Sequence, residues 1–66
     1  MHSIVDLTRY EKRRLRILIQ RERHAAIRTR MLIILHLAKG HTPTDVAAYA
    51  HVARSTVYRV ADRFRT

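Results

Sequence analysis

The sequence predicts an all-α fold, a small bundle of three to four helices, and three observations support this class. The chain has a single Gly and a single Pro. It has no stretch of useful length in which polar and apolar residues alternate, as they do in a half-buried strand. Its apolar residues instead recur at helical spacing, behind residues that favour helix starts. A chain of 66 residues has room for one domain, so we expect a single domain over residues 1–66.

The first expected helix runs from about Arg9 to Arg21. Thr8 and Glu11 have the spacing of a capping box, in which the Thr hydroxyl and the Glu carboxylate each accept a backbone N–H at the helix start. The inward face of this helix is expected to hold three apolar residues, Leu15, Leu18 and Ile19.

The second expected helix runs from about His24 to Lys39, and Gly40 ends it because glycine adopts the left-handed conformation at little cost. Apolar residues of this helix occupy nearly its whole circumference, and His36 alone is expected to face away from the bundle. Such a helix is normally central, with the first helix on one side and the carboxy-terminal pair on the other. A self-association surface, and hence a homodimer, is the alternative.

The third expected helix covers residues 43–50. Thr42 can cap it, Pro43 suits its first position and Asp45 favours its positive end. Its inward residues are small, which lets a neighbouring helix cross closely: Val46, Ala47 and Ala50. Residues 51–53 then turn the chain.

The fourth expected helix covers residues 54–65. Its inward arc is apolar and consists of Ala53, Val57, Val60, Ala61 and Phe64. Its outward face is polar and cationic, with Ser55, Tyr58, Arg59 and Asp62 at the centre and Arg54, Thr56, Arg63 and Arg65 beside them. Two short helices joined by a tight turn, the second of them basic, are typical of proteins that read a DNA groove. A plain solvated amphipathic helix is the alternative.

The charge indicates a polyanionic partner. Fourteen Lys and Arg oppose five Asp and Glu, for a net charge of +9 and a pI near 11.5. Double-stranded DNA is the partner that we expect. A second phosphate-binding surface, with solvated helix faces as its alternative, comprises Lys12, Arg13, Arg14, Arg16, Arg21, Arg23, Arg28 and Arg30.

Several other classes of protein are excluded on composition. The chain has no Cys, and the histidines include no i, i+4 pair, so we expect no metal site: they are His2, His24, His36, His41 and His51. Asp45, His51 and Ser55 do not make a credible hydrolase triad. We expect no cofactor and no small-molecule ligand. No apolar run is long enough for a membrane span and no secretory signal begins the chain, so we expect the cytoplasm, with the nucleoid as its site in a bacterium.

The order of residues across the last three helices resembles a known family. After the apolar helix come Lys39-Gly40-His41-Thr42, Val46-Ala47, and Val52-Ala53-Arg54-Ser55-Thr56-Val57-Tyr58-Arg59. This order resembles the homeodomain-like helix-turn-helix at the amino end of mariner-like insertion-sequence transposases; similar modules occur in resolvases and small regulators. The resemblance covers about residues 27–64. His51 stands where the family usually has Gly, and Ala53 where it usually has a capping Ser.

The resemblance implies that the domain binds the terminal inverted repeats of a mobile element. By position, it assigns base contacts at the start of the recognition helix to Arg54, Ser55, Thr56, Tyr58 and Arg59. A phosphate contact is the alternative for Arg59, local capping for Ser55 and Thr56, and a plain surface position for Tyr58. Asp62 is expected to pair with Arg59 or Arg65.

Phosphate contacts are expected from helix starts and from basic side chains. Thr42 and Thr44 begin the third helix, where a positive helix end attracts phosphate, and plain capping is the alternative for Thr42. The basic residues in this set are Arg63, Lys12, Arg13, Arg14, Arg28 and Arg30.

No catalytic residue is expected, because a transposase of this type needs a separate domain that holds metal ions with three carboxylates. The chain is then either the amino-terminal part of a transposase or a free-standing binding protein. The alternatives are a small dimeric transcriptional regulator, which would bind a palindrome, and a helical oligomerisation module. RNA is a weaker expectation, since few aromatic side chains are placed to stack on bases.

Overall fold

The computed structural model describes residues 5–65, which form four α-helices and no strand. The helices are α1 (Arg9–Arg21), α2 (Ala25–Ala38), α3 (Pro43–Ala50) and α4 (Arg54–Arg65). The predicted all-α class is therefore confirmed. Three helices have the predicted bounds, and α2 is one residue shorter at each end because His24 and Lys39 are its caps.

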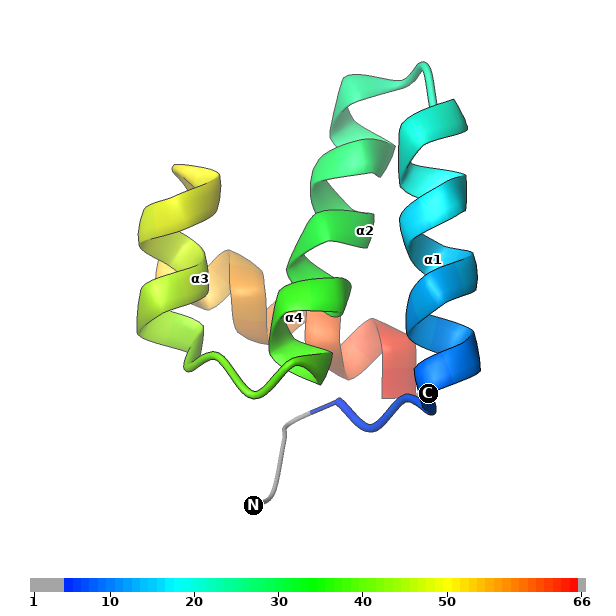
Figure 1. The fold of residues 1–66 in the computed structure, drawn as a ribbon. Helices are drawn as coiled ribbons and strands as arrows, with labels where there is room; N and C mark the ends of the chain where they lie inside the picture. Colours follow the sequence, from blue (N-terminus) through cyan, green and yellow to red (C-terminus); the bar gives the residue numbers. More distant parts are fainter. Residues whose placement is uncertain (1–4, 66) are drawn as a thin grey trace.

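The helices are arranged around α2 (Figure 1). α1 lies beside α2 and runs antiparallel to it, while α3 lies on the other side of α2. α4 crosses behind α2 and α3 and packs against both. The expected arrangement, with the first helix on one side and the carboxy-terminal pair on the other, is therefore confirmed.

The start of α1 has the predicted capping box. The Glu11 backbone N–H donates to Thr8 Oγ1 at 3.1 Å, and the Thr8 backbone N–H donates to Glu11 Oε1 at 2.8 Å. The backbone N–H of Thr8 is the main cause that holds the pKa of the Glu11 carboxyl below its ordinary value, and the Thr8 hydroxyl adds to it. This reciprocal pair fixes where the chain enters the bundle.

A residue with positive φ follows each of the next two helices, Gly40 after α2 and His51 after α3. Gly40 has a φ of 95°, and the following N–H of His41 donates to the His36 carbonyl at 3.2 Å. His51 has φ 57° and ψ 44°, and the Val52 N–H donates to the Ala47 carbonyl at 3.1 Å. At each helix end, the positive-φ residue and the backbone hydrogen bond after it end the helix and turn the chain sharply. The turn at His51 sets the angle between α3 and α4.

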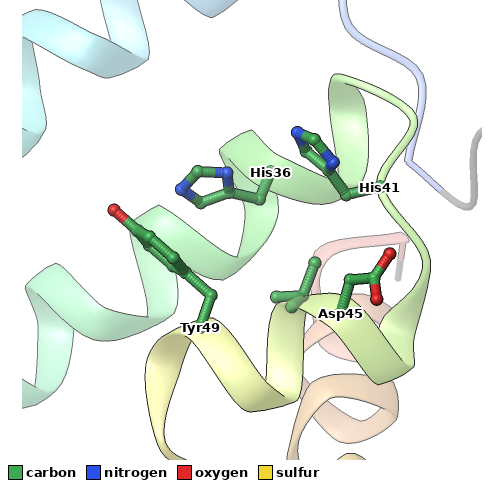
Figure 2. Close-up of a pocket in the computed structure, with 5 residues that line it drawn as sticks. His36, His41, Asp45 and Tyr49 are labelled. Carbon is green, nitrogen blue, oxygen red and sulfur yellow. The ribbon is translucent and has the colours of Figure 1, made fainter.

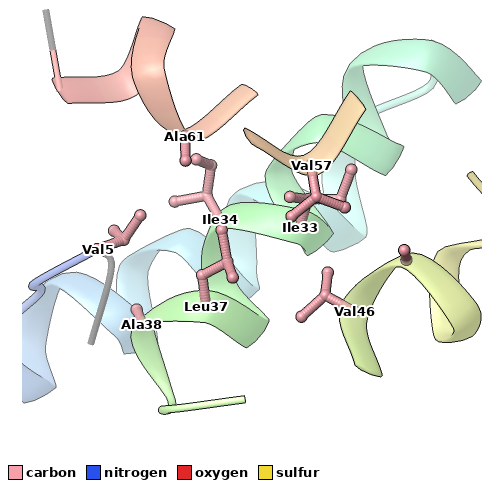
Figure 3. Close-up of a cluster of buried hydrophobic side chains, with 9 residues drawn as sticks. Val5, Ile33, Ile34, Leu37, Ala38, Val46, Val57 and Ala61 are labelled. Atoms are coloured by element: carbon pink, nitrogen blue, oxygen red, sulfur yellow. The ribbon is translucent and has the colours of Figure 1, made fainter. Parts of the chain in front are cut away.

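The core lies where α2, α3 and α4 meet (Figure 3). Leu37 and Val57 are fully buried, and Ile33, Val46 and Ala61 are nearly so. Figure 3 shows these side chains converging from the three helices. One further member, Val5, is only 1% exposed and belongs to the segment before α1. Sequence periodicity gave no signal for Val5, because it belongs to no helix.

Several side chains lie elsewhere than predicted. Phe64 and Ala53 were expected to face inward from α4, yet Phe64 is 48% exposed and Ala53 is also exposed. Leu18, expected on the inward face of α1, is 43% exposed. His36 was expected to face away from the bundle, but it is half-buried against α3. Each of these predictions was wrong because a helical wheel gives a direction and not the reach of the neighbouring helix.

Candidate nucleic-acid interface

The outward face of α4 is polar and held in place by two buried anchors. Val57 and Ala61 fix the helix against the core, with 0% and 1% exposure. Four of the five predicted base-contacting residues are then exposed on the helix: Arg54, Ser55, Tyr58 and Arg59. The fifth, Thr56, is half-buried at the edge of this face. The fold thus presents hydroxyl, phenol and guanidinium groups together along the first turns of one helix.

The starts of α3 and α4 are brought together by a side-chain contact. Arg54 Nη1 donates to Thr44 Oγ1 at 3.5 Å, a long hydrogen bond that joins a predicted base contact to a predicted phosphate contact. Thr42 caps α3, because its hydroxyl oxygen accepts the Asp45 N–H at 3.2 Å. A capping hydroxyl still has its own hydrogen to donate, so this role is compatible with a phosphate contact.

Replacing the cap tests its structural role. Thr42→Ala is expected to lower the free energy of unfolding by about 1 kcal/mol, because the Asp45 N–H loses its partner. Thr42→Ser keeps the hydroxyl and should retain most of the stability, and chemical denaturation measures both. Equal stability of the Ala and Ser variants would contradict the capping role.

Basic residues from two helices, α2 and α4, line a shared groove. Arg59 and Arg63 of α4 line it together with Arg30 of α2. Leu15 of α1 lines the same groove, which places the first half of α1 beside the end of α4. The structure therefore brings predicted DNA contacts from α2 and α4 into one neighbourhood. Lys12, Arg13 and Arg14 precede Leu15 on α1, and their phosphate contacts stay predictions.

Arg28 has a structural partner. Its Nε and Nη2 atoms donate to the backbone carbonyl of Glu22 at 3.0 and 2.7 Å. These bonds close the turn between α1 and α2. A phosphate contact by Arg28 stays a prediction, and it would have to be made while the guanidinium holds this turn.

Asp62, an acidic residue on the largely cationic helix α4, forms an ion pair with an arginine of the same helix. Its Oδ1 atom lies 2.6 Å from Arg65 Nη2, one turn along α4. The expected pairing of Asp62 with a neighbouring arginine is therefore confirmed for Arg65. The pair is exposed, so its contribution to stability is small, but it offsets the negative charge that a DNA phosphate would meet there.

A scan against protein-family models matches residues 24–66 to a homeodomain-like domain. This region spans about two thirds of the chain and holds α2, α3 and α4. The chain belongs to the homeodomain-like family. No curated protein and no solved structure was found to be similar to the chain.

The homeodomain-like unit gives each helix a place. α2 is its first helix, α3 and α4 form its helix-turn-helix, and α4 is the helix that such domains present to a DNA groove. α1 lies outside the matched region and packs along α2. The family and the charge of +9 support DNA binding as the general activity of this domain.

Neither a metal-binding cluster nor a membrane-spanning helix occurs in the described part of the chain. Over residues 5–65, no three His, Asp or Glu side chains converge as metal ligands. His2, one of the five histidines for which the sequence predicts no metal site, lies outside the described residues. No helix in the described range is long and apolar enough to cross a membrane.

A second pocket lies between α2 and α3, at the loop that joins them (Figure 2). It has a volume of about 410 Å³ and is lined by His36, His41, Asp45 and Tyr49, with Val46 beneath. The His36 ring lies 4.5 Å from the Tyr49 ring and 5.6 Å from the His41 ring, centroid to centroid. Sequence reasoning missed this cluster, because its rings come from separate elements.

The environment of His36 makes the fold sensitive to acid. Burial is the main cause that lowers the pKa of His36 below its ordinary value of 6.5, and the charges of Lys39 and His41 add to it. A histidine whose pKa is lower in the folded state favours folding when neutral. Its stabilising effect is thus present above the ordinary pKa and is lost as the pH falls below it. Asp45 and Tyr49 also face this cluster, and neither carries positive charge.

We expect the free energy of unfolding to decrease between pH 7 and pH 5, and His36→Gln to reduce this decrease because the titrating ring is gone. Denaturation at a series of pH values measures the effect. His24→Gln is the matched control, since His24 is an exposed residue before α2. A decrease of the same size in His36→Gln and in the parent chain would contradict the prediction.

Proposed function

We propose that this chain is a sequence-specific DNA-binding module that docks α4 in the major groove and serves as the transposon-end-binding domain of a transposase. The observation that carries the DNA-reading part is the exposed first half of α4, where Arg54, Ser55, Tyr58 and Arg59 project while Val57 anchors the helix. Residues at this place in a recognition helix reach base edges when the helix enters the groove.

Phosphate contacts would hold α4 in register. The start of α3, with Thr42 and Thr44, would lie against one backbone strand, because N–H groups at a helix start attract anions. Arg63 of α4 and Arg30 of α2 would neutralise phosphates on the flank of the recognition helix. In this proposal the chain performs no catalysis, and cleavage and joining of DNA belong to a separate catalytic domain.

The transposase role is supported by the resemblance that covers about residues 27–64. A small dimeric regulator is the second candidate. It is favoured by apolar side chains that remain exposed on α1 and α2, since such residues are common where two copies meet: Ile17, Leu18 and Ile27 are 48%, 43% and 41% exposed.

Selection of bound sequences from a random duplex pool at about 150 mM salt tests the proposal. The selected duplex is then titrated against scrambled DNA. An enriched asymmetric site supports transposon-end recognition, and a palindrome supports a dimeric regulator. Weak, salt-sensitive binding with no enrichment would contradict sequence-specific recognition and leave a basic helical module.

A further inference from the structure

An open groove lies between α1, α2 and α4, on the flank of the recognition helix. It has a volume of about 460 Å³. Its floor is apolar and includes Leu15, Met31, Val60 and Phe64, which come from all three helices. Three arginines, Arg30, Arg59 and Arg63, also line the groove, and we call them its rim. The groove therefore combines an apolar floor with a rim of one charge.

Phe64 makes the floor accessible. The core itself is closed, with Leu37 and Val57 fully buried, whereas Phe64 is 48% exposed at the end of α4. A phenyl ring left half in water beside a concave apolar surface gains free energy when another apolar group covers it. The groove can thus accept one or two apolar side chains of a partner.

The rim selects the charge of that partner. A second copy of this chain has a net charge of +9 and would bring more cations to the three arginines. An acidic partner would pair with them, and arginine favours carboxylates because its planar fork donates two hydrogen bonds at once. An apolar anchor flanked by carboxylates is the pattern of an acidic amphipathic helix.

We infer that this groove binds an acidic amphipathic helix, and that the helix competes with DNA. The inference rests on the proposed function, because Arg59 and Thr56 are expected DNA contacts and both also line the groove. A partner helix seated there would pair with Arg59 and cover Thr56, so the same side chains could not contact DNA. Its carboxylates would occupy guanidinium groups that otherwise meet phosphates.

A designed peptide tests the groove without DNA. The probe is a fluorescein-labelled helix of about 16 residues, with Leu and Phe at i, i+4 and i+7 and Glu at most other positions. The control peptide has the same charge, with Ala in place of Leu and Phe. Fluorescence anisotropy at about 150 mM salt is expected to show at least tenfold tighter binding of the Leu/Phe peptide.

The chain offers a matched pair of variants. Phe64→Ala removes an apolar side chain of the groove and is expected to weaken binding of the Leu/Phe peptide about tenfold. Ile17→Ala removes one with the same exposure, 48%, from a part of α1 outside the groove, and should leave binding unchanged. Both positions are half exposed, so both variants are expected to keep the fold, and circular dichroism is the check.

Charge reversal tests the rim in the same way. Arg30→Glu should weaken peptide binding several-fold more than Arg16→Glu, since Arg16 is exposed on α1 outside the groove. Equal binding of the Leu/Phe and Ala peptides would overturn the proposal, and so would equal effects of Phe64→Ala and Ile17→Ala. Self-association that is lost in Phe64→Ala would assign the groove to a second copy and would also overturn it.

Competition is measured last, with labelled duplex. Unlabelled Leu/Phe peptide is expected to displace the selected duplex, and the Ala peptide to do so at least tenfold less well. Peptide binding without displacement would overturn the competition. A chain that binds the peptide but no specific DNA would contradict the proposed function and leave the groove as a binding site, so the two failures are distinguishable.

Discussion

Leu37→Ala is expected to lower the free energy of unfolding by about 3 kcal/mol. Leu37 is 0% exposed and lies on α2, where the side chains of α3 and α4 converge. Alanine would leave a cavity there that the surrounding helices could fill only in part. A domain of this size has a total stability of roughly 3–10 kcal/mol, so the loss is a large share of it.

Thermal and urea denaturation measure this loss, with an expected decrease in Tm of roughly 10–25 °C. Ile17→Ala is the matched control, since Ile17 is 48% exposed, and it should change the stability by less than about 0.5 kcal/mol. Leu37→Met keeps the volume and should cost less than about 1.5 kcal/mol. A loss below about 1 kcal/mol in Leu37→Ala would mean that this part of the core is not tightly packed.

Local chemistry was enough to predict the helix boundaries. Thr8 and Glu11 start α1, Thr42 and Pro43 start α3, and Gly40 ends the turn after α2. Each signal depends on residues within one turn of the boundary, so no knowledge of the fold was needed. The left-handed turn at His51 lies within residues 51–53, where the sequence predicts that the chain turns, and at the position where the resembled family usually has Gly.

Tertiary packing was less predictable. Phe64 points towards the bundle on a helical wheel, yet it stays 48% exposed because it lies beside an open groove. Val5 is buried although it belongs to no periodic pattern. His36 packs against Tyr49 of another helix. In each case the outcome depends on which element lies next to the residue, and a single sequence does not specify that.

The sequence predicted which residues lie on the outward face of α4, but not the hydrogen bonds that these and neighbouring side chains make. Periodicity placed Tyr58 and Arg59 outward on α4, and the structure agrees. The hydrogen bonds from Arg54 to Thr44 and from Arg28 to Glu22 link separate elements, and the spacing of these residues in the sequence does not predict them. Contacts with DNA involve a second molecule, so the roles given to these side chains stay predictions until binding is measured.

Arg59→Ala is expected to weaken binding to the selected duplex by roughly 5- to 150-fold, the effect of losing a bidentate pair with guanine. Arg59 is exposed on α4, between Thr56 and Arg63 on the groove side. Binding to random duplex loses only one charge contact and should fall much less.

Lys12→Ala is the matched control for the loss of charge alone, because Lys12 is on α1 and not on the recognition helix. It should weaken binding to the selected and random duplexes alike, and should reduce the slope of log K against log salt by about one. Titrations of both variants on both duplexes at several salt concentrations separate the two effects. If Arg59→Ala also weakens both duplexes equally, Arg59 contacts a phosphate, and specificity must come from other side chains such as Arg54 and Tyr58.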